Sequence, residues 1–355
     1  IILNPQYLII GSNGDHFRDY SYFDKESGVV IVDRFTGRLV NRIADQQLGD
    51  MDVNGLLLYE GRLYFGNDNE EFLCTTPGGK IIWRNPTSGD IEHQPERINI
   101  HGRQAIVYAS EMGEVRAVEP LSGKTIWQYY TPDFDGWKIG DNRLFFKVKA
   151  FFSNSANFFT KPQLADLNYD GVLDLIYLSN DNKIYAINGA SGKKLWIREI
   201  DSRTGYVLQV AQTPQGPMIG VPISSYIGYN ASTENYIQWY DRMGIEYKCF
   251  PLPDDCTRSL NHLPYSDAKS IFLSDDGLYV LSPDGVKAAV DRSDKIYVNT
   301  YWSENKYVSR HAGESILANA SFNYGDQGKC VIVLNQHYYV NYQRSYIEIV
   351  SLDVQ

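Results

Sequence analysis

The sequence has few cysteines, no long hydrophobic run and no excess of positive charge. Four cysteines in 355 residues are too few for the dense framework of a small disulfide-rich scaffold. Cys249 and Cys256 lie on either side of two prolines, and the sequence does not decide whether they form a disulfide. No cluster of cysteine and histidine has zinc spacing. No segment approaches the ~20 apolar residues of a membrane span. The start, IILNPQYLII, lacks the basic region of a signal peptide and indicates a strand or a mature terminus.

Acidic residues outnumber basic residues by 43 to 33, giving a formal net charge of −10. An acidic chain lacks the electrostatic footprint for nucleic acid or for an anionic membrane surface, so we expect neither as a partner. The chain carries 27 Tyr, 15 Phe and 6 Trp, and 43% of its residues are apolar. This composition excludes disorder and favours a β-rich globular protein.

Three segments share one pattern, a strand, a turn ending in Gly-Lys, and a second strand with Trp four residues after the glycine. They are EFLCTTPGGKIIW (71–83), VRAVEPLSGKTIW (115–127) and IYAINGASGKKLW (184–196). A tight hairpin needs a residue that tolerates positive φ, which glycine does. We therefore expect Gly79, Gly123 and Gly192 in the turns. Their tryptophans, Trp83, Trp127 and Trp196, should each cover a neighbouring unit.

Weaker copies place further turn glycines at Gly37, Gly244 and Gly285. The six glycines are spaced by about one four-stranded propeller blade, apart from a longer gap before Gly192. The spacing predicts an all-β fold, a single β-propeller domain over residues 1–355. Seven blades are favoured and eight are the alternative, with rim insertions at about 131–160 and 299–312. The first blade lacks a visible inner strand before YLIIGS, and the seventh lacks a visible outer strand.

These units resemble the quinoprotein-type (PQQ-like) β-propeller repeat, over about three quarters of the chain. The resemblance implies either a PQQ-dependent dehydrogenase or a non-catalytic propeller of outer-membrane assembly. The adjacent cysteine pair of the dehydrogenases is missing, so we do not expect PQQ as a cofactor.

The segment LADLNYDGVLDLIYLS (164–179) contains the pattern D-x-N-x-D-G-x-x-D. Oxygen ligands at this spacing suit Ca²⁺, which predicts a metal site formed by the side chains of Asp166, Asn168, Asp170 and Asp174 and the carbonyl of Val172. Asp at the ninth position, with strands on both sides, differs from an EF-hand. The loop resembles instead the calcium loop of FG-GAP repeats in integrin-type propellers, which joins the first two strands of a blade. This resemblance implies a structural calcium ion.

Two segments look like worn copies of this loop. GDMDVNGLLLY offers Asp50, Asp52 and Asn54, and ANASFNYGDQG offers Asn319, Ser321 and Asn323. Both lack the full carboxylate set, so we expect polar turns without metal at these positions.

The preferred function is a non-catalytic, calcium-binding scaffold that is secreted, periplasmic or on the cell surface and binds protein or glycan at its rim or channel. The alternative is a polysaccharide lyase or another carbohydrate-active enzyme with a His/Tyr/Arg site. No motif assigns a catalytic residue, and the available histidines are His16, His93, His101, His262, His311 and His337. A His, Tyr and Arg cluster within hydrogen-bond reach of one point in the central channel would favour the enzyme.

Overall fold

All regular elements that the computed structural model describes are β-strands. The described residues are 2–3, 5–12, 28–43, 52–132, 134, 158, 161–200, 203–204, 208–225, 234–252, 262–266, 269–274, 277–288, 295–302, 313–323, 329–339 and 342–352. These ranges contain no helix, and therefore no helix able to cross a membrane. The chain divides into two compact units, residues 1–200 and 201–355.

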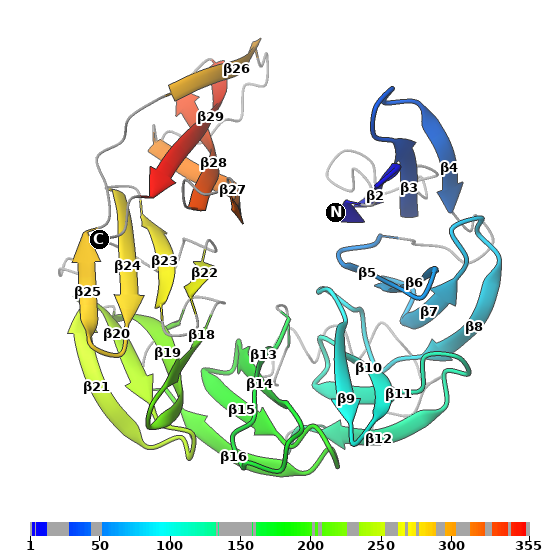
Figure 1. The fold of residues 1–355 in the computed structure, drawn as a ribbon, viewed down its shortest axis with the longest axis horizontal. Coiled ribbons are helices and arrows are strands. Elements are labelled where there is room, and N and C mark those ends of the chain that lie inside the picture. The colour runs from blue at the N-terminus through cyan, green and yellow to red at the C-terminus, as the bar shows by residue number, and fades with distance from the viewer. Residues whose placement is uncertain are drawn as a thin grey trace. The chain divides into compact units, whose positions relative to one another are not determined.

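The first unit contains four antiparallel sheets, each built from four consecutive strands (Figure 1). Sheet 1 consists of β1 (Ile2–Leu3), β2 (Tyr7–Ser12), β3 (Gly28–Asp33) and β4 (Leu39–Ile43). Sheet 2 consists of β5 (Leu56–Tyr59), β6 (Arg62–Asn67), β7 (Glu71–Thr75) and β8 (Ile81–Pro86). Sheet 3 consists of β9 (Glu96–Ile100), β10 (Arg103–Ala109), β11 (Glu114–Val118) and β12 (Thr125–Tyr130). Sheet 4 consists of β13 (Gln163–Ala165), β14 (Asp174–Ser179), β15 (Lys183–Ile187) and β16 (Lys194–Glu199).

The second unit contains three sheets. Sheet 5 consists of β17 (Arg203–Thr204), β18 (Gln209–Thr213), β19 (Gly216–Ser225), β20 (Glu234–Tyr240) and β21 (Glu246–Pro251), with β17 and β18 both paired to β19. Sheet 6 consists of β22 (His262–Ser266), β23 (Lys269–Ser274), β24 (Gly277–Ser282) and β25 (Gly285–Ala288). Sheet 7 consists of β26 (Lys295–Trp302), β27 (Gly313–Asn323), β28 (Lys329–Tyr339) and β29 (Tyr342–Leu352).

Six of these sheets have four strands and sheet 5 has five, which confirms the predicted all-β class built from blade-like sheets, but the expectations for the first and last blades were wrong. The two-residue strand β1 pairs with β2 through Ile2 and Ile9, so sheet 1 has an inner strand. In sheet 7 the order is β26-β29-β28-β27. Its missing outer strand is thus β26, which precedes the other three in the chain and contains residues 299–302 of the second expected insertion.

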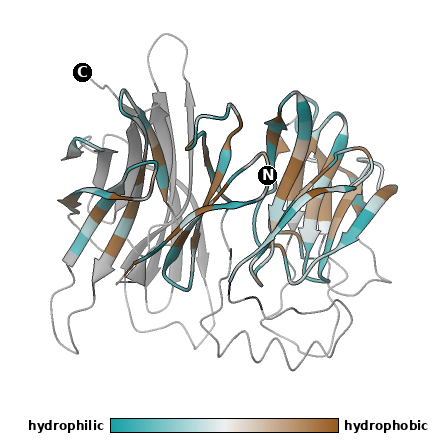
Figure 2. Ribbon diagram, turned by 90° about the horizontal axis from the view of Figure 1, so that it is seen from below, coloured by the Kyte–Doolittle hydropathy of each residue, from teal (hydrophilic) through white to brown (hydrophobic). Residues whose placement is uncertain are grey.

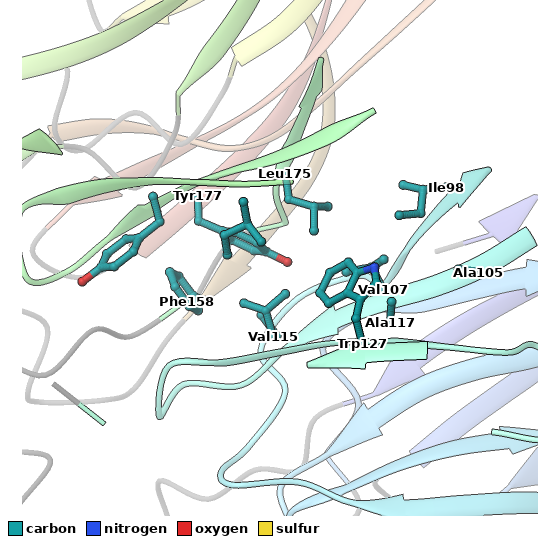
Figure 3. Close-up of a cluster of buried hydrophobic side chains, with 12 residues drawn as sticks. Ile98, Ala105, Val107, Val115, Ala117, Trp127, Phe158, Leu175 and Tyr177 are labelled. Atoms are coloured by element: carbon teal, nitrogen blue, oxygen red, sulfur yellow. The ribbon is translucent and has the colours of Figure 1, made fainter. Parts of the chain in front are cut away.

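The cores of the first unit lie between successive sheets. Ile31 of β3 packs with Leu63 of β6, and Phe72 of β7 packs with Tyr108 of β10, with their ring centroids 3.9 Å apart. Between sheets 3 and 4, Val107 and Trp127 meet the residues of β14 and β15 (Figure 3). Figure 2 shows apolar stretches along the strands and polar stretches at many of the turns. The alternating strands therefore bury both faces only by stacking, as blades do.

The predicted turn glycines all have positive φ, from +68° at Gly37 to +148° at Gly285. Two of the predicted tryptophan contacts are also present. The indole nitrogen of Trp83 donates to the Pro120 carbonyl of sheet 3 at 3.0 Å, and that of Trp127 donates to the Gly189 carbonyl of sheet 4 at 2.8 Å. Each tryptophan thus joins its sheet to the turn of the next.

Most of the first expected insertion, 131–160, lies outside the described residues. The alternative of an eighth blade formed by this segment therefore stays untested. One of its residues, Phe158, is fully buried between sheets 3 and 4, where its ring lies 4.6 Å from that of Tyr177. Cys249 is an exposed free thiol on β21, and Cys256 lies outside the described residues.

Candidate functional site

The predicted calcium loop joins β13 to β14, the first two strands of sheet 4. Tyr169 and Gly171 have φ of +62° and +82°, which curls the backbone around the acidic side chains. The Asp166 carboxylate accepts the backbone N–H groups of Asp170 at 3.1 Å and Gly171 at 3.0 Å. Asp170 in turn accepts the N–H of Val172 at 2.9 Å. The loop is therefore organised around its own carboxylates.

Asp174 closes the loop and is fully buried. It accepts the backbone N–H groups of Leu167 at 2.9 Å and Gly189 at 3.0 Å. Burial raises its pKa to about 6, against the lowering effect of these hydrogen bonds, and the charges of Asp170 and Asp166 raise it further. A cation in the loop would oppose both of the raising effects.

Asn188, in the turn between β15 and β16, is a member of this site that the spacing pattern did not predict. Its side-chain oxygen accepts from Ser191, which fixes the amide orientation. Its nitrogen therefore donates to Asp170 at 2.8 Å and to Asp174 at 3.2 Å. Asn188 thus holds the two carboxylates as a hydrogen-bond donor, and its own oxygen does not face the loop.

The donor set of this loop fits a hard cation. Asp166, Asn168, Asp170 and Asp174 supply oxygen atoms, which Ca²⁺ prefers. No lysine or arginine that the structure describes forms an ion pair with the three carboxylates. Their oxygens do not converge as a group within 4.8 Å, so ligation requires side-chain rotation away from the backbone N–H groups.

The group of acidic side chains that does converge within 4.8 Å among the described residues is Asp68, Asp90 and Glu92. They come from the turn after β6 and from the segment after β8, so no sequence spacing could have indicated them. Asn54, from the first worn copy, donates to Glu92 at 2.7 Å. That copy therefore supplies a hydrogen-bond donor to this acidic group.

The second worn copy was expected to form a polar turn, and this expectation was wrong. Asn319, Ser321 and Asn323 lie in β27 and pair in register with β28. Residues 319–323 are paired with β28 in the sheet, so they do not form a loop that could surround an ion.

His93 and His101, the two histidines whose side-chain surroundings the structure describes, do not form an accessible catalytic cluster. His93 is 4% exposed, and its ring lies 6.0 Å from that of the buried Tyr177. Burial lowers the pKa of His93 to about 4, so its imidazole is neutral at pH 7. His101 lies in the turn between β9 and β10, and its charge helps to lower the pKa of Asp170 in the loop of sheet 4. A buried neutral histidine in a packed core cannot act on a polysaccharide from solution.

In each of the two units, exposed apolar side chains lie mostly at the same end of their own sheets. We define the turn edge of a sheet as the edge where its first and second strands, and its third and fourth strands, are joined. Eleven large apolar side chains are exposed among the described residues. Ten of these lie in such a turn or in the first two residues of the strand that follows: Phe35, Leu39, Val40, Ile82, Leu121, Tyr169, Leu173, Met243, Ile245 and Tyr247. The other, Tyr130, ends β12 at the opposite edge.

Comparison with known proteins gives a family and a fold. The family model described as outer membrane protein assembly factor BamB matches residues 25–301. None of the curated proteins matches the sequence at a significant level.

Among solved structures, BamB from Moraxella catarrhalis is 11% identical with a TM-score of 0.47, and each chain is covered to 91%. The computationally designed Ika8 protein is 10% identical with a TM-score of 0.55, covering 96% of this chain and 82% of that one. Sqt1 of Saccharomyces cerevisiae is 14% identical with a TM-score of 0.53, covering 92% and 79%. At such identities the likeness concerns the fold. The match over most of the sequence shows that the chain belongs to the outer membrane protein assembly factor BamB family.

Proposed function

We propose that this protein is a non-catalytic scaffold of the cell envelope that binds other proteins through the turn edge of its sheets. The observation that carries the proposal is the placement of ten of the eleven exposed large apolar side chains at that edge. Single exposed apolar residues are ordinary on any surface, but their recurrence at the turn edge of sheet after sheet favours an interaction surface there. The family description, with its reference to outer-membrane protein assembly, favours a protein partner.

A bound calcium ion is part of this proposal. The ligands are Asp166, Asn168, Asp170 and Asp174 with the Val172 carbonyl, and the role is structural. Two exposed apolar residues, Tyr169 and Leu173, belong to the same loop, so an ion that fixes the loop also fixes part of the binding edge. Weak extracellular calcium sites fill where the ion is abundant, which favours a periplasmic, secreted or cell-surface location.

Site-specific photocrosslinking in the native envelope tests the binding surface. A photoreactive residue replaces Leu121 at the turn edge of sheet 3, or Ile245 at that of sheet 5. The matched control replaces Tyr130, which is also apolar and exposed but lies at the opposite edge. We expect protein adducts from Leu121 and Ile245 and none from Tyr130.

Adducts of equal yield from Tyr130 would overturn the assignment of the turn edge. Adducts with glycan alone, confirmed by binding to a glycan array, would assign the edge to carbohydrate recognition. In that outcome Tyr169 and Tyr247 are the side chains whose exposed rings a sugar would cover.

A further inference from the structure

The second unit has a pocket of about 530 Å³ at the turn edge of sheets 5 and 6. Three turns form it, those between β18 and β19, between β20 and β21, and between β24 and β25. Sheets 5 and 6 pack directly on one another beneath it, since Val286 of β25 lies against the buried cluster of Trp239 and Leu252. The pocket therefore has a packed base.

The walls of the pocket are apolar and held in place. Pro214, Pro217 and Pro283 line it together with Met218 and Tyr247. Proline has a fixed φ and no N–H group, so these walls are stiff and offer few backbone donors. The turns are braced from within, because the Thr213 hydroxyl donates to the Gly216 carbonyl at 2.8 Å. Such a preformed apolar pocket accepts a side chain at low entropic cost.

The polar part of the pocket is acidic. Asp241 accepts the backbone N–H groups of Met243 and Ile245, both at 2.8 Å, through one carboxylate oxygen. Asp284 is exposed, and neither aspartate forms an ion pair with a residue that the structure describes. The lining also contains Arg242, whose guanidinium lies 3.5 Å from the Met243 sulfur. Two carboxylates against one guanidinium leave the lining with a net negative charge.

We propose that this pocket docks an extended segment of a partner protein that inserts one apolar side chain between Met218 and Tyr247 and places a lysine or arginine against Asp284. The apolar walls select the inserted side chain, and the acidic lining selects the neighbouring cation. This inference rests on the proposed function, since it names the kind of segment that one part of the turn edge recognises. It is the side-chain-in-pocket form of recognition, in which a central anchor carries most of the affinity.

A phage-displayed library of random dodecapeptides, selected on the full-length protein, tests the inference. We expect the recovered peptides to carry a large apolar residue with lysine or arginine within two positions. A synthetic peptide of the recovered sequence should lose at least tenfold in affinity with Asp284→Lys and with Tyr247→Ala. Both side chains are exposed, so neither replacement removes core packing. Raising the salt concentration should weaken binding to the wild-type protein.

The matched control is Glu199→Lys, which makes the same charge change at an exposed residue of sheet 4 outside the pocket. It should leave the affinity for the peptide unchanged. Peptides without the apolar and basic pair, or equal affinity for wild type, Asp284→Lys and Tyr247→Ala, would refute the pocket assignment. The crosslinking experiment at Leu121 and Ile245 tests the turn edge independently of this pocket. Protein adducts there, together with a failed peptide selection, would reject the pocket and leave the proposed binding edge standing.

Discussion

The indole of Trp83 lies against the backbone of Gly123, in the third-to-fourth-strand turn of the next sheet. A Cβ atom on Gly123 would come within 2.6 Å of the indole Cδ2, closer than packed carbon atoms approach. Gly192 stands in the same relation to Trp127, whose nearest indole atom, Cε3, would lie 2.5 Å from such a Cβ atom. Glycine is thus required at each of these turns for two reasons: the positive φ, and the indole ring that occupies the space of a Cβ atom. The repeated Gly and Trp pair is the contact that joins one sheet to the next.

Replacing Gly123 by alanine should therefore cost more stability than backbone strain alone. Alanine at positive φ costs about 1–2 kcal/mol, and overpacking against Trp83 adds about 1–3 kcal/mol. Gly102, in the same sheet with φ of +91°, has nothing within 4 Å of its Cβ position. Gly102→Ala should show the strain alone, as a smaller fall in the urea midpoint. Equal losses in the two variants would mean that the indole moves aside freely.

The bond from Trp127 to Gly189 should be measurable in the same way. Trp127 is 7% exposed, so Trp127→Phe keeps an aromatic ring in the core but leaves the Gly189 carbonyl without its donor. The unpaired buried group should cost about 1–3 kcal/mol in urea unfolding. Tyr130→Phe is the control, since it removes a hydroxyl from an exposed ring of the same strand and should change stability by less than about 0.5 kcal/mol. A Trp127→Phe variant as stable as the control would contradict the role of this bond.

Gly189 also connects Trp127 to the calcium loop, because its N–H donates to Asp174 while its carbonyl accepts from the indole. If calcium fills the loop, it should stabilise this junction by mass action, by about 2.7 kcal/mol at one hundred times the Kd. We expect calcium to raise the melting temperature, EDTA to lower it, and Asp170→Ala to remove both responses. The control is Asp33→Ala, because Asp33 caps the turn before Gly37 with three hydrogen bonds outside the loop. A wild-type protein that melts alike in calcium and EDTA would show that the loop holds no structural ion.

The turn glycines could be predicted from sequence because their requirement is local: each sits in its own hairpin at positive φ. Asn188 could not, since it reaches Asp170 and Asp174 only through the hairpin formed by β14, β15 and the turn that follows. The pairing of β26 with β29 also escaped prediction, because it depends on which edge of a completed hairpin remains open. Strand β1 has two residues and gains its place from pairing with β2. Local sequence chemistry thus predicted the repeating hairpin unit. The strand pairing in the first and last sheets and the contact of Asn188 with the loop depended on residues distant in sequence.

His93 should make the protein sensitive to acid. Its folded pKa of about 4 lies below the usual 6.5 because the ring is buried, and nearby Lys161 lowers it further. A histidine with a lowered pKa contributes stability that is present above about pH 6.5 and is lost as the pH falls toward 4. At 1.36 kcal/mol per unit the loss reaches about 3 kcal/mol. Other ionisable groups at this position are Tyr177, against the ring, and Glu96, which pairs with Lys161 at 3.2 Å.

The test compares urea unfolding of wild type and His93→Gln from pH 7 to pH 4 in the absence of calcium. The difference in unfolding free energy between wild type and His93→Gln reports the histidine alone, because Asp174 is present in both proteins. Asp174 acts in the opposite sense: its raised pKa gives a contribution to stability that falls as the pH rises toward 6. We expect wild type to lose up to about 3 kcal/mol more than the variant over this range. Phe158→Leu is the control, because it disturbs the packing on Tyr177 without removing a titrating group, and it should keep the wild-type slope. Parallel curves for wild type and His93→Gln would place the acid sensitivity elsewhere.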